Sequence, residues 1–346
     1  TNRIMTFMPP MLMMLMNLLG VAIVWVASHR INAGNMQVGS MTAFLTYSMM
    51  IVMSFMILTV MSILIPRAGV AANRIDEVIS SESSVVDGSD AIDIEDCIGR
   101  LEFDNVSFRY EGSDEDALSG ISFTANPGET TAIIGSTGSG KSTIVNLIPR
   151  FFDVTAGCIR LDGRDIRDIS MKSLRDQVGL VPQKGILFSG TIDSNIRFGN
   201  EAATPEEVRE AAEIAQALEF IEEKEDKFES AIAQGGSNVS GGQKQRISIA
   251  RAIAKKPKIL VFDDSFSALD MKTDAKLRRV LAKHEKEATK IIVAQRVGTI
   301  IDAEQIIVLD EGEIVGKGRH RDLLRTCETY RQIAESQLSK SELEVE

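Results

Sequence analysis

Residues 135–142 read Gly-Ser-Thr-Gly-Ser-Gly-Lys-Ser and follow directly on the apolar run Thr130–Ile134. A strand that enters a glycine-rich turn and then a helix is the context that a phosphate-binding loop requires. Glycines let backbone amides turn towards phosphate oxygens, Lys141 can reach the terminal phosphates, and the Ser142 hydroxyl can ligate Mg²⁺. A glycine-rich turn without chemistry is the alternative, which the completeness of the match disfavours. We therefore predict nucleotide binding by Gly135, Ser136, Thr137, Gly138, Ser139, Gly140, Lys141, Ser142 and Thr143.

A carboxylate that could complete this site follows a second apolar run. A phosphate loop needs an acidic partner for its metal ion, normally at the end of a neighbouring hydrophobic strand. The apolar residues 259–262 end at Asp263. Alone, an apolar run that ends in aspartate is usually structural. Its pairing with a complete phosphate loop favours a metal-binding role for Asp263.

A third motif lies between these two. Residues 238–246 contain Ser240-Gly241-Gly242-Gln243, and a helical pattern follows over Ile247–Lys255. Ser240 is suited to cap a helix, and two glycines in the first turn expose amides to an anion. Ser-Gly-Gly by itself would be a flexible turn. With the other two motifs, the pattern predicts a helix whose start points at a phosphate.

The N-terminal residues 1–66 differ in kind from the rest, because they carry only two formal charges. Their two uncharged runs exceed the about 20 residues that a helix needs to cross a hydrocarbon core of about 30 Å. We predict two spanning helices, Ile4–Ala27 and Gly39–Ile65, joined by a polar loop around His29–Asn35. A cleaved signal peptide and a buried soluble core are alternatives that the lengths disfavour.

Charge and cysteine content exclude other classes. The chain of 346 residues has 38 Lys+Arg against 49 Asp+Glu, a net charge of −11. This balance argues against a protein that coats nucleic acid, so we expect no nucleic-acid partner. Three cysteines without metal-ligand spacing suit a reducing compartment rather than a disulfide scaffold.

We expect four segments along the chain. Residues 1–79 form the membrane part, in which Arg67–Ile79 is a helix that leaves the bilayer. Residues 80–99 are rich in Ser, Asp and Gly and are expected to be a solvated linker. Residues 100–338 form the nucleotide domain, in which Glu206–Glu223 is expected to be a helix, and residues 339–346 form an acidic tail.

These motifs, in this order, resemble a known family. Residues 100–338 are similar to the nucleotide-binding domain of an ATP-binding cassette (ABC) transporter. Residues 1–79 resemble the last two membrane helices of ABC exporters whose membrane and ATPase halves are fused. The resemblance implies an α-helical transmembrane segment, two helices of a larger bundle, and an α/β P-loop ABC ATPase domain with a helical signature subdomain. It also implies that the chain is part of a longer subunit.

The resemblance assigns roles by motif. Tyr110 resembles the aromatic residue that stacks on adenine, and residues 267–270 the loop that links two ATP sites. Gln183 resembles the glutamine that touches Mg²⁺ and faces the membrane domain, so the implied metal ligands are Ser142, Gln183 and Asp263. In this family two ATPase domains close head to tail. The signature residues that complete the partner's ATP site would be Ser240, Gly241, Gly242 and Gln243.

Two catalytic positions depart from the family pattern. The residue after the metal-binding aspartate is usually Glu, and a later motif supplies His; this chain has Asp264 and Gln295. Aspartate is one methylene shorter, and loss of a positioned base typically costs about 10²- to 10⁴-fold in rate. Glutamine has no imidazole to carry charge. A smaller departure is Gln234, where relatives often have Glu, while the signature glycines are retained.

The economical interpretation is the degenerate-site subunit of a heterodimeric, multidrug-type exporter. It would bind ATP and Mg²⁺ and hydrolyse ATP slowly at its own site. Its partners would be a second half-transporter with intact Glu and His, the lipid bilayer, and an apolar or amphipathic small-molecule cargo. The resemblance places it in the plasma (inner) membrane as a multi-pass protein, with the ATPase domain in the cytoplasm.

Other functions stay open. A slow homodimer would carry Asp264 and Gln295 at both sites. A regulatory or channel-like protein could use nucleotide only as a ligand. Import instead of export is compatible with the fused layout, and a soluble chromosome-type ATPase shares the signature but not the two spans.

Overall fold

The structure is a computed structural model that describes residues 2–338. The chain divides into two compact units, residues 1–83 and residues 84–346. The predicted acidic tail, residues 339–346, lies outside the described residues.

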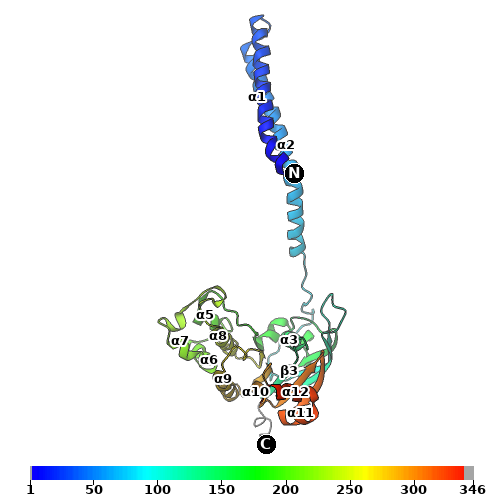
Figure 1. The fold of residues 1–346 in the computed structure, drawn as a ribbon, viewed down its shortest axis with the longest axis vertical. Helices are drawn as coiled ribbons and strands as arrows, with labels where there is room; N and C mark the ends of the chain where they lie inside the picture. The colour runs from blue at the N-terminus through cyan, green and yellow to red at the C-terminus, as the bar shows by residue number, and fades with distance from the viewer. Residues whose placement is uncertain (1, 339–346) are drawn as a thin grey trace. The chain divides into compact units, whose positions relative to one another are not determined.

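The first unit is a helical hairpin, in which α1 (Asn2–Asn32) lies alongside α2 (Val38–Ile79) (Figure 1). The stretches Pro10–Asn32 and Val38–Ile79 are long and apolar enough to cross a membrane. Hydroxyls on α2 donate back to the preceding turn, for example Ser62 Oγ to Leu58 O at 2.9 Å. Such bonds satisfy polar groups within the helix, as a lipid environment requires.

Two details of the hairpin differ from the sequence expectation. His29, Arg30 and Asn32 belong to α1 and not to the loop, which is confined to residues 33–37. His29 Nδ1 lies 3.0 Å from Trp25 O, a contact within the last turns of the helix. The exit helix is not separate either, because α2 continues through Pro66 to Ile79.

The second unit contains two larger sheets. A six-stranded sheet has the order β12-β11-β3-β10-β9-β6, and only β12 runs antiparallel to its neighbour. A four-stranded antiparallel sheet has the order β2-β1-β4-β5, and β7 pairs with β8. The strands are β1 (Leu101–Phe108), β2 (Leu118–Ala125), β3 (Thr130–Gly135), β4 (Ala156–Leu161), β5 (Arg164–Asp165), β6 (Val178–Val181), β7 (Gly190–Thr191), β8 (Ala231–Ile232), β9 (Ile259–Asp263), β10 (Thr289–Val293), β11 (Gln305–Asp310) and β12 (Glu313–Gly318).

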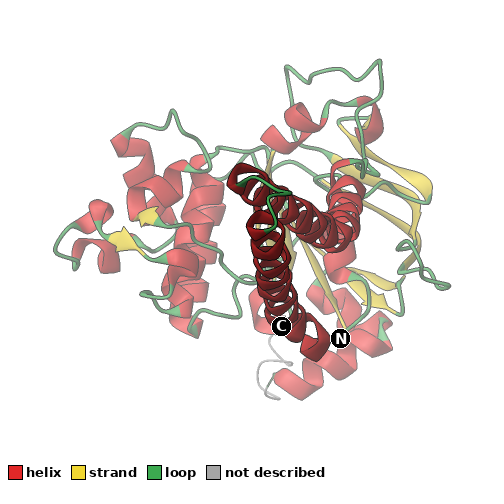
Figure 2. Ribbon diagram, turned by 90° about the horizontal axis from the view of Figure 1, so that it is seen from above, coloured by secondary structure: helices red, strands yellow, loops and turns green. Residues whose placement is uncertain are grey.

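Helices form a lobe beside the sheets and cover the faces of the larger sheet. Figure 2 shows this lobe, with α5 to α8, on the opposite side from the two larger sheets. The helices of this unit are α3 (Lys141–Leu147), α4 (Met171–Asp176), α5 (Ile192–Arg197), α6 (Pro205–Ile214), α7 (Leu218–Glu222), α8 (Gly241–Ala254), α9 (Met271–His284), α10 (Val297–Ile300), α11 (His320–Thr326) and α12 (Glu328–Gln337).

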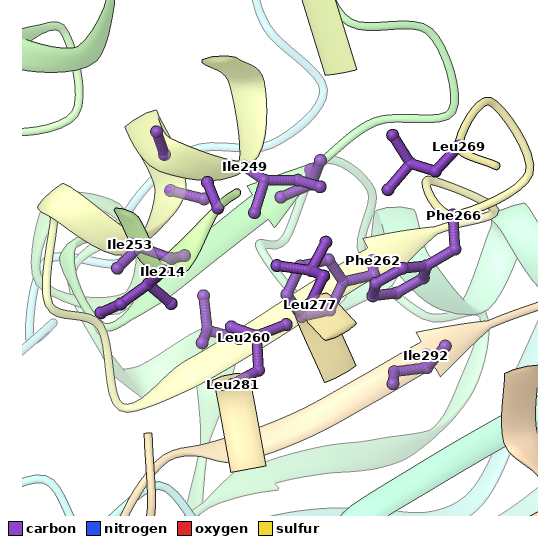
Figure 3. Packing of buried hydrophobic residues seen from close by; sticks show 14 of the residues in the cluster. Ile214, Ile249, Ile253, Leu260, Phe262, Phe266, Leu269, Leu277, Leu281 and Ile292 are labelled. Atoms are coloured by element: carbon purple, nitrogen blue, oxygen red, sulfur yellow. The ribbon is translucent and has the colours of Figure 1, made fainter. Parts of the chain in front are cut away.

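The central parallel strands are apolar on both faces because each face is covered. In β9, Leu260 and Phe262 pack into one hydrophobic cluster, whereas Ile259 and Val261 pack into a second on the other face. Figure 3 shows the first cluster, in which Phe262 and Leu277 pack against side chains from neighbouring helices. The sheet therefore holds the carboxyl ends of its strands in a rigid frame.

The predicted helix over 206–223 is two helices. α6 ends at Ile214, α7 begins at Leu218, and Gln216 between them has a φ of +56°. The Gln216 carbonyl accepts a hydrogen bond of 2.7 Å from Arg246 Nη1. The tertiary contact with α8 thus uses a carbonyl that a continuous helix would have kept for itself.

The predicted solvated linker ends early. From residue 84 onwards the chain packs on the ATPase unit: Val85 and Cys97 are buried, and Ile92 forms a bridge to Ile169. Arg150, itself buried, donates to Val86 O at 3.1 Å. The polar composition of residues 80–99 predicted a solvated linker, but residues from 84 onwards find partners within the domain.

Candidate functional site

The phosphate loop lies between β3 and α3, as the sequence predicts. A Cβ added at Gly135 would lie 2.1 Å from Leu309 O of the adjacent strand β11. Gly140 has a φ of +95°, and a Cβ there would lie 2.6 Å from Leu118 Cδ2. Close backbone approach and a left-handed turn therefore require glycine at both ends of the loop.

Lys141 lies folded across the loop. Its Nζ donates to Gly135 O at 2.8 Å and to Ser136 O at 2.5 Å, and it lies 3.4 Å from Ser139 Oγ. Burial lowers the pKa of Lys141, while the nearby carboxylates of Asp264 and Asp263 oppose that shift. The lysine is thus placed where the loop would hold terminal phosphates.

Ser142 and Asp263 converge at the start of α3 and the end of β9. Ser142 Oγ donates to Asp263 Oδ1 at 3.4 Å. Burial raises the pKa of Asp263; the Ser142 hydrogen bond opposes this rise, Asp264 adds to it, and Lys141 also opposes it. A hydroxyl and a carboxylate are hard oxygen ligands that suit Mg²⁺. Within residues 2–338 no group of three His, Cys, Asp or Glu side chains is placed to hold a metal ion.

Asp264 lies at the centre of a side-chain cluster that joins the two positions altered from the family pattern. Its Oδ2 accepts from Gln295 Nε2 at 2.8 Å and from Gln183 Nε2 at 3.1 Å. Asp264 is buried, has a φ of +45°, and its backbone amide donates to Val293 O. The structure thus brings together Gln183, Asp264 and Gln295. The predicted contact of Gln183 with Mg²⁺ stays a prediction.

Tyr110 lies beside the end of the loop. Its hydroxyl is 3.2 Å from Thr143 Oγ1, and its ring packs edge-on against Phe108 and Phe152. The residue is 37% exposed, and an exposed aromatic ring can stack on a planar group. Phe152 is not among the residues predicted from the sequence, where its only signal is the aromatic pair at 151–152.

The signature motif forms the start of α8. Ser240 Oγ accepts from Gln243 N at 3.3 Å, and Gln243 Oε1 accepts from Ser240 N at 3.1 Å, which is a capping box. A Cβ added at Gly241 would meet nothing within 4 Å. Gln243 is therefore engaged in the cap, whereas the amides beside Gly241 are open to an anion. Contacts of all four residues with a partner's ATP stay predictions.

The loop and the signature motif lie on different parts of the unit. Figure 1 shows α8 among the helices α5 to α7, and α3 with β3 among the strands. Residues 267–270 follow the cluster, and Ser267 Oγ donates to Asp264 O at 2.7 Å. The phosphate loop and the signature motif are therefore two separate surfaces of this unit.

Comparison with known proteins agrees with this geometry. Residues 118–267 match the family model described as ABC transporter. The chain is 44% identical over 334 residues to an uncharacterized ABC transporter ATP-binding protein of Mycobacterium tuberculosis, covering 95% of this chain and 57% of the relative. It is 37% identical over 334 residues to an ATP-dependent lipid A-core flippase of Hahella chejuensis, covering 96% of this chain and 57% of the relative.

A solved structure of a bacterial Atm1-family ABC exporter with ATP bound is similar throughout. The match has a TM-score of 0.83 and 32% identity, and it covers 98% of this chain and 60% of that chain. The chain thus spans about three fifths of the length of these relatives. Its ATPase unit is therefore similar to that of ABC transporters, and the chain as described has the fold of the corresponding part of an ABC exporter.

Proposed function

We propose that this chain is a subunit of an ATP-driven exporter of the plasma (inner) membrane, with its ATPase unit in the cytoplasm. Its own phosphate loop binds Mg-ATP at a slowly hydrolysing site. Its signature helix completes the competent site of a different partner subunit that carries Glu and His at the corresponding positions. Similarity to exporters and a flippase supports the transport role.

The observation that carries the proposal is the bonding of Asp264. A general base must present its carboxylate to the water that it activates. In this chain one carboxylate oxygen accepts from both Gln183 and Gln295, and the residue is buried. Neither amide can accept and pass on a proton as an imidazole can. The cluster is therefore poorly suited to activate water, which supports slow hydrolysis at this site.

The residues present fit Mg-ATP. Ser142 and Asp263 would hold Mg²⁺, Lys141 would contact the terminal phosphates, and Tyr110 would stack on the base. When bound there, Mg²⁺ would supply positive charge that offsets the negative charge developing during phosphoryl transfer. ATP binding at both sites closes the paired domains, and hydrolysis at the partner's site reopens them.

The membrane helices suggest the class of cargo. Thirteen of the fifteen methionines lie within residues 1–61. Flexible thioether side chains can repack around apolar or amphipathic small molecules, although methionine also serves as packing filler in lipid. ATP-dependent flux of such a molecule in vesicles would distinguish a transporter from a nucleotide-gated channel, which would show ion current without flux.

The test isolates the proposed slow site. In the assembled transporter, Gly241→Glu on this chain silences the partner's site, so the remaining ATP turnover reports this chain's own loop. Adding Asp264→Glu with Gln295→His should then raise turnover at least about tenfold. Turnover that does not rise would contradict the assigned defect.

A matched control uses the same two types of substitution away from the cluster. Asp302 and Gln332 are exposed, so Asp302→Glu with Gln332→His should leave turnover unchanged. Mass measurement of the extracted complex tests the partner directly. A single polypeptide in that complex would favour the slow homodimer.

A further inference from the structure

The last residue of α12 contacts the segment that carries Gln295. Gln337 Nε2 donates to Gln295 O at 2.9 Å, and Gln337 Oε1 accepts from Val297 N at 2.8 Å. One side-chain amide thus holds the backbone on both sides of Arg296. Together the two hydrogen bonds fix both the position and the orientation of this backbone segment, which one bond alone would not do.

α12 is itself firmly anchored. Tyr330 and Ala334 are fully buried, and the Tyr330 hydroxyl lies 2.7 Å from His320 Nδ1. Residues spaced by four and then three positions share one helix face, so Gln337 continues the face of Tyr330 and Ala334. Val297 belongs to the same hydrophobic cluster. The amide of Gln337 is therefore presented from a rigid element.

Among the residues that the structure describes, no other side chain is hydrogen-bonded to the backbone of residues 295–297, although Arg296 O accepts from Thr299 N at 3.2 Å. α10 is only four residues long, and its N-cap residue Arg296 makes no side-chain capping bond. On the other side, Ala294 N donates to Ile133 O of β3 at 3.1 Å. Only Gln295 and Arg296 lie between the anchored Ala294 and Val297. Gln337 thus closes a short span whose first residue reaches Asp264.

The second amide that contacts Asp264 is held in the same way. Gln245 of α8 is 1% exposed; it donates to Pro182 O at 3.0 Å and accepts from Gly185 N at 2.9 Å. Gln183 lies inside this clamped stretch. Each of the two glutamines on Asp264 is therefore carried by a segment that another glutamine side chain clamps by its backbone.

We propose that Gln337 is a positioning residue for Gln295: its clamp on the backbone sets how the Gln295 side chain approaches Asp264. The inference rests on the proposed nucleotide function of that cluster. It places a determinant of the site in the C-terminal helix, 42 residues after Gln295. Gln337 itself touches neither Asp264 nor the phosphate loop among the described contacts.

The first measurement requires no catalysis. Gln337→Met keeps the length of the side chain but removes both hydrogen bonds, and Gln337→Glu keeps only the acceptor for Val297 N–H. Amide exchange in the assembled transporter should show Val297 exchanging about fivefold faster in Gln337→Met. Gln337→Glu should retain most of the protection. Gln332→Met, on the same helix, removes only the hydrogen bond from Gln332 to Glu328, so it is the matched control and should leave Val297 exchange unchanged.

The second measurement is a double-mutant cycle on turnover at this chain's own site, with Gly241→Glu present to silence the partner's site. In the Asp264→Glu, Gln295→His background, Gln337→Met should lower kcat about tenfold and change KM for ATP less than twofold. With Gln295→Ala, the same Gln337→Met should change kcat less than twofold, because no side chain is left to position.

Two results would overturn the inference. Unchanged exchange at Val297 in Gln337→Met would show that the clamp restrains nothing. An equal fold loss of kcat in both backgrounds would show that Gln337 acts through general stability. A failure of the proposed function is a separate result, since it appears as restoring substitutions that do not raise turnover while Val297 exchange still responds to Gln337.

Discussion

The phosphate loop and the signature helix of one chain are built in opposite ways. The space around the phosphate loop is already occupied by groups of this chain. Lys141 Nζ donates to two loop carbonyls, and a Cβ at Gly140 would clash with Leu118. The signature start is open, since Gly241 has free space where a side chain would be and its helix is already capped. The difference fits the proposal that the loop binds nucleotide with groups of its own chain, whereas the signature meets a surface outside this chain.

The largest expected effect is on ATP turnover, after a substitution in the open signature motif. Gly241→Glu should lower total ATP turnover of the assembled transporter by about 10²-fold or more, because a carboxylate would occupy the place of a phosphate. Folding should be unaffected, because the new side chain meets nothing in this chain. Gly88→Glu, also in open space, is the control. Retained turnover would mean that the signature does not face nucleotide.

Substitution of a glycine in the phosphate loop should instead lower the stability of the fold. Gly140→Ala should lower the free energy of unfolding by about 1–3 kcal/mol, because the φ of +95° and the close contact with Leu118 both resist a side chain. Gly241→Ala is the matched substitution and should leave stability nearly unchanged. Thermal unfolding of the two purified variants measures the difference. Equal stabilities would remove the contrast between the two half-sites.

A smaller effect on turnover is expected for Asp264, which lies between Gln183 and Gln295. Asp264→Asn keeps an oxygen that accepts from Gln183 and Gln295, so own-site turnover should change less than twofold with the partner's site silenced by Gly241→Glu. A loss of tenfold or more would show that Asp264 already acts as a base. The comparison with Asp264→Glu, which should raise turnover in the presence of Gln295→His, sharpens the assignment.

The smallest expected effect is on the pH dependence of stability. It involves His320, which contacts Tyr330 of α12, the helix that carries Gln337. Burial lowers the pKa of His320, Arg321 adds to the shift, and Asp302 opposes it. The unfolded chain then binds the proton more readily, so stability is full above the ordinary histidine pKa of about 6.5 and declines as pH falls below it. His320→Gln should flatten this dependence in thermal unfolding between about pH 8 and about pH 5. An equally steep decline in the variant would assign it to other groups.

Local motifs in the sequence correctly predicted the strands and helices that carry the candidate site. The strand before the loop, the apolar strand that ends at Asp263, and the capped helix after Ser240 are all present. Each depends on neighbouring residues, whose spacing alone sets periodicity, capping and turn formation. The two membrane-length helices were predicted for the same reason, since length and lack of charge are local properties.

Other predictions failed where distant contacts outweighed composition. The stretch 84–99 is polar, yet it packs on the domain through Val85, Cys97 and partners such as Arg150. The stretch 206–223 favours helix throughout, yet a contact from Arg246 accompanies a break at Gln216. Arg150 and Arg246 both lie outside the segments that they contact, so the local sequence of those segments could not predict the contacts.

The amino-acid sequence by itself determined which chemical groups this protein has for nucleotide, because a phosphate loop, a capped glycine pair and an acidic strand end are formed by consecutive residues. Only the tertiary structure decided how these groups meet. Asp264 contacts Gln295 and Gln183, which lie 31 and 81 positions away, and Gln337 holds its segment from 42 positions away. The physical reason is that hydrogen bonds of side chains depend on distances in space, which the packing of the sheet and helices sets.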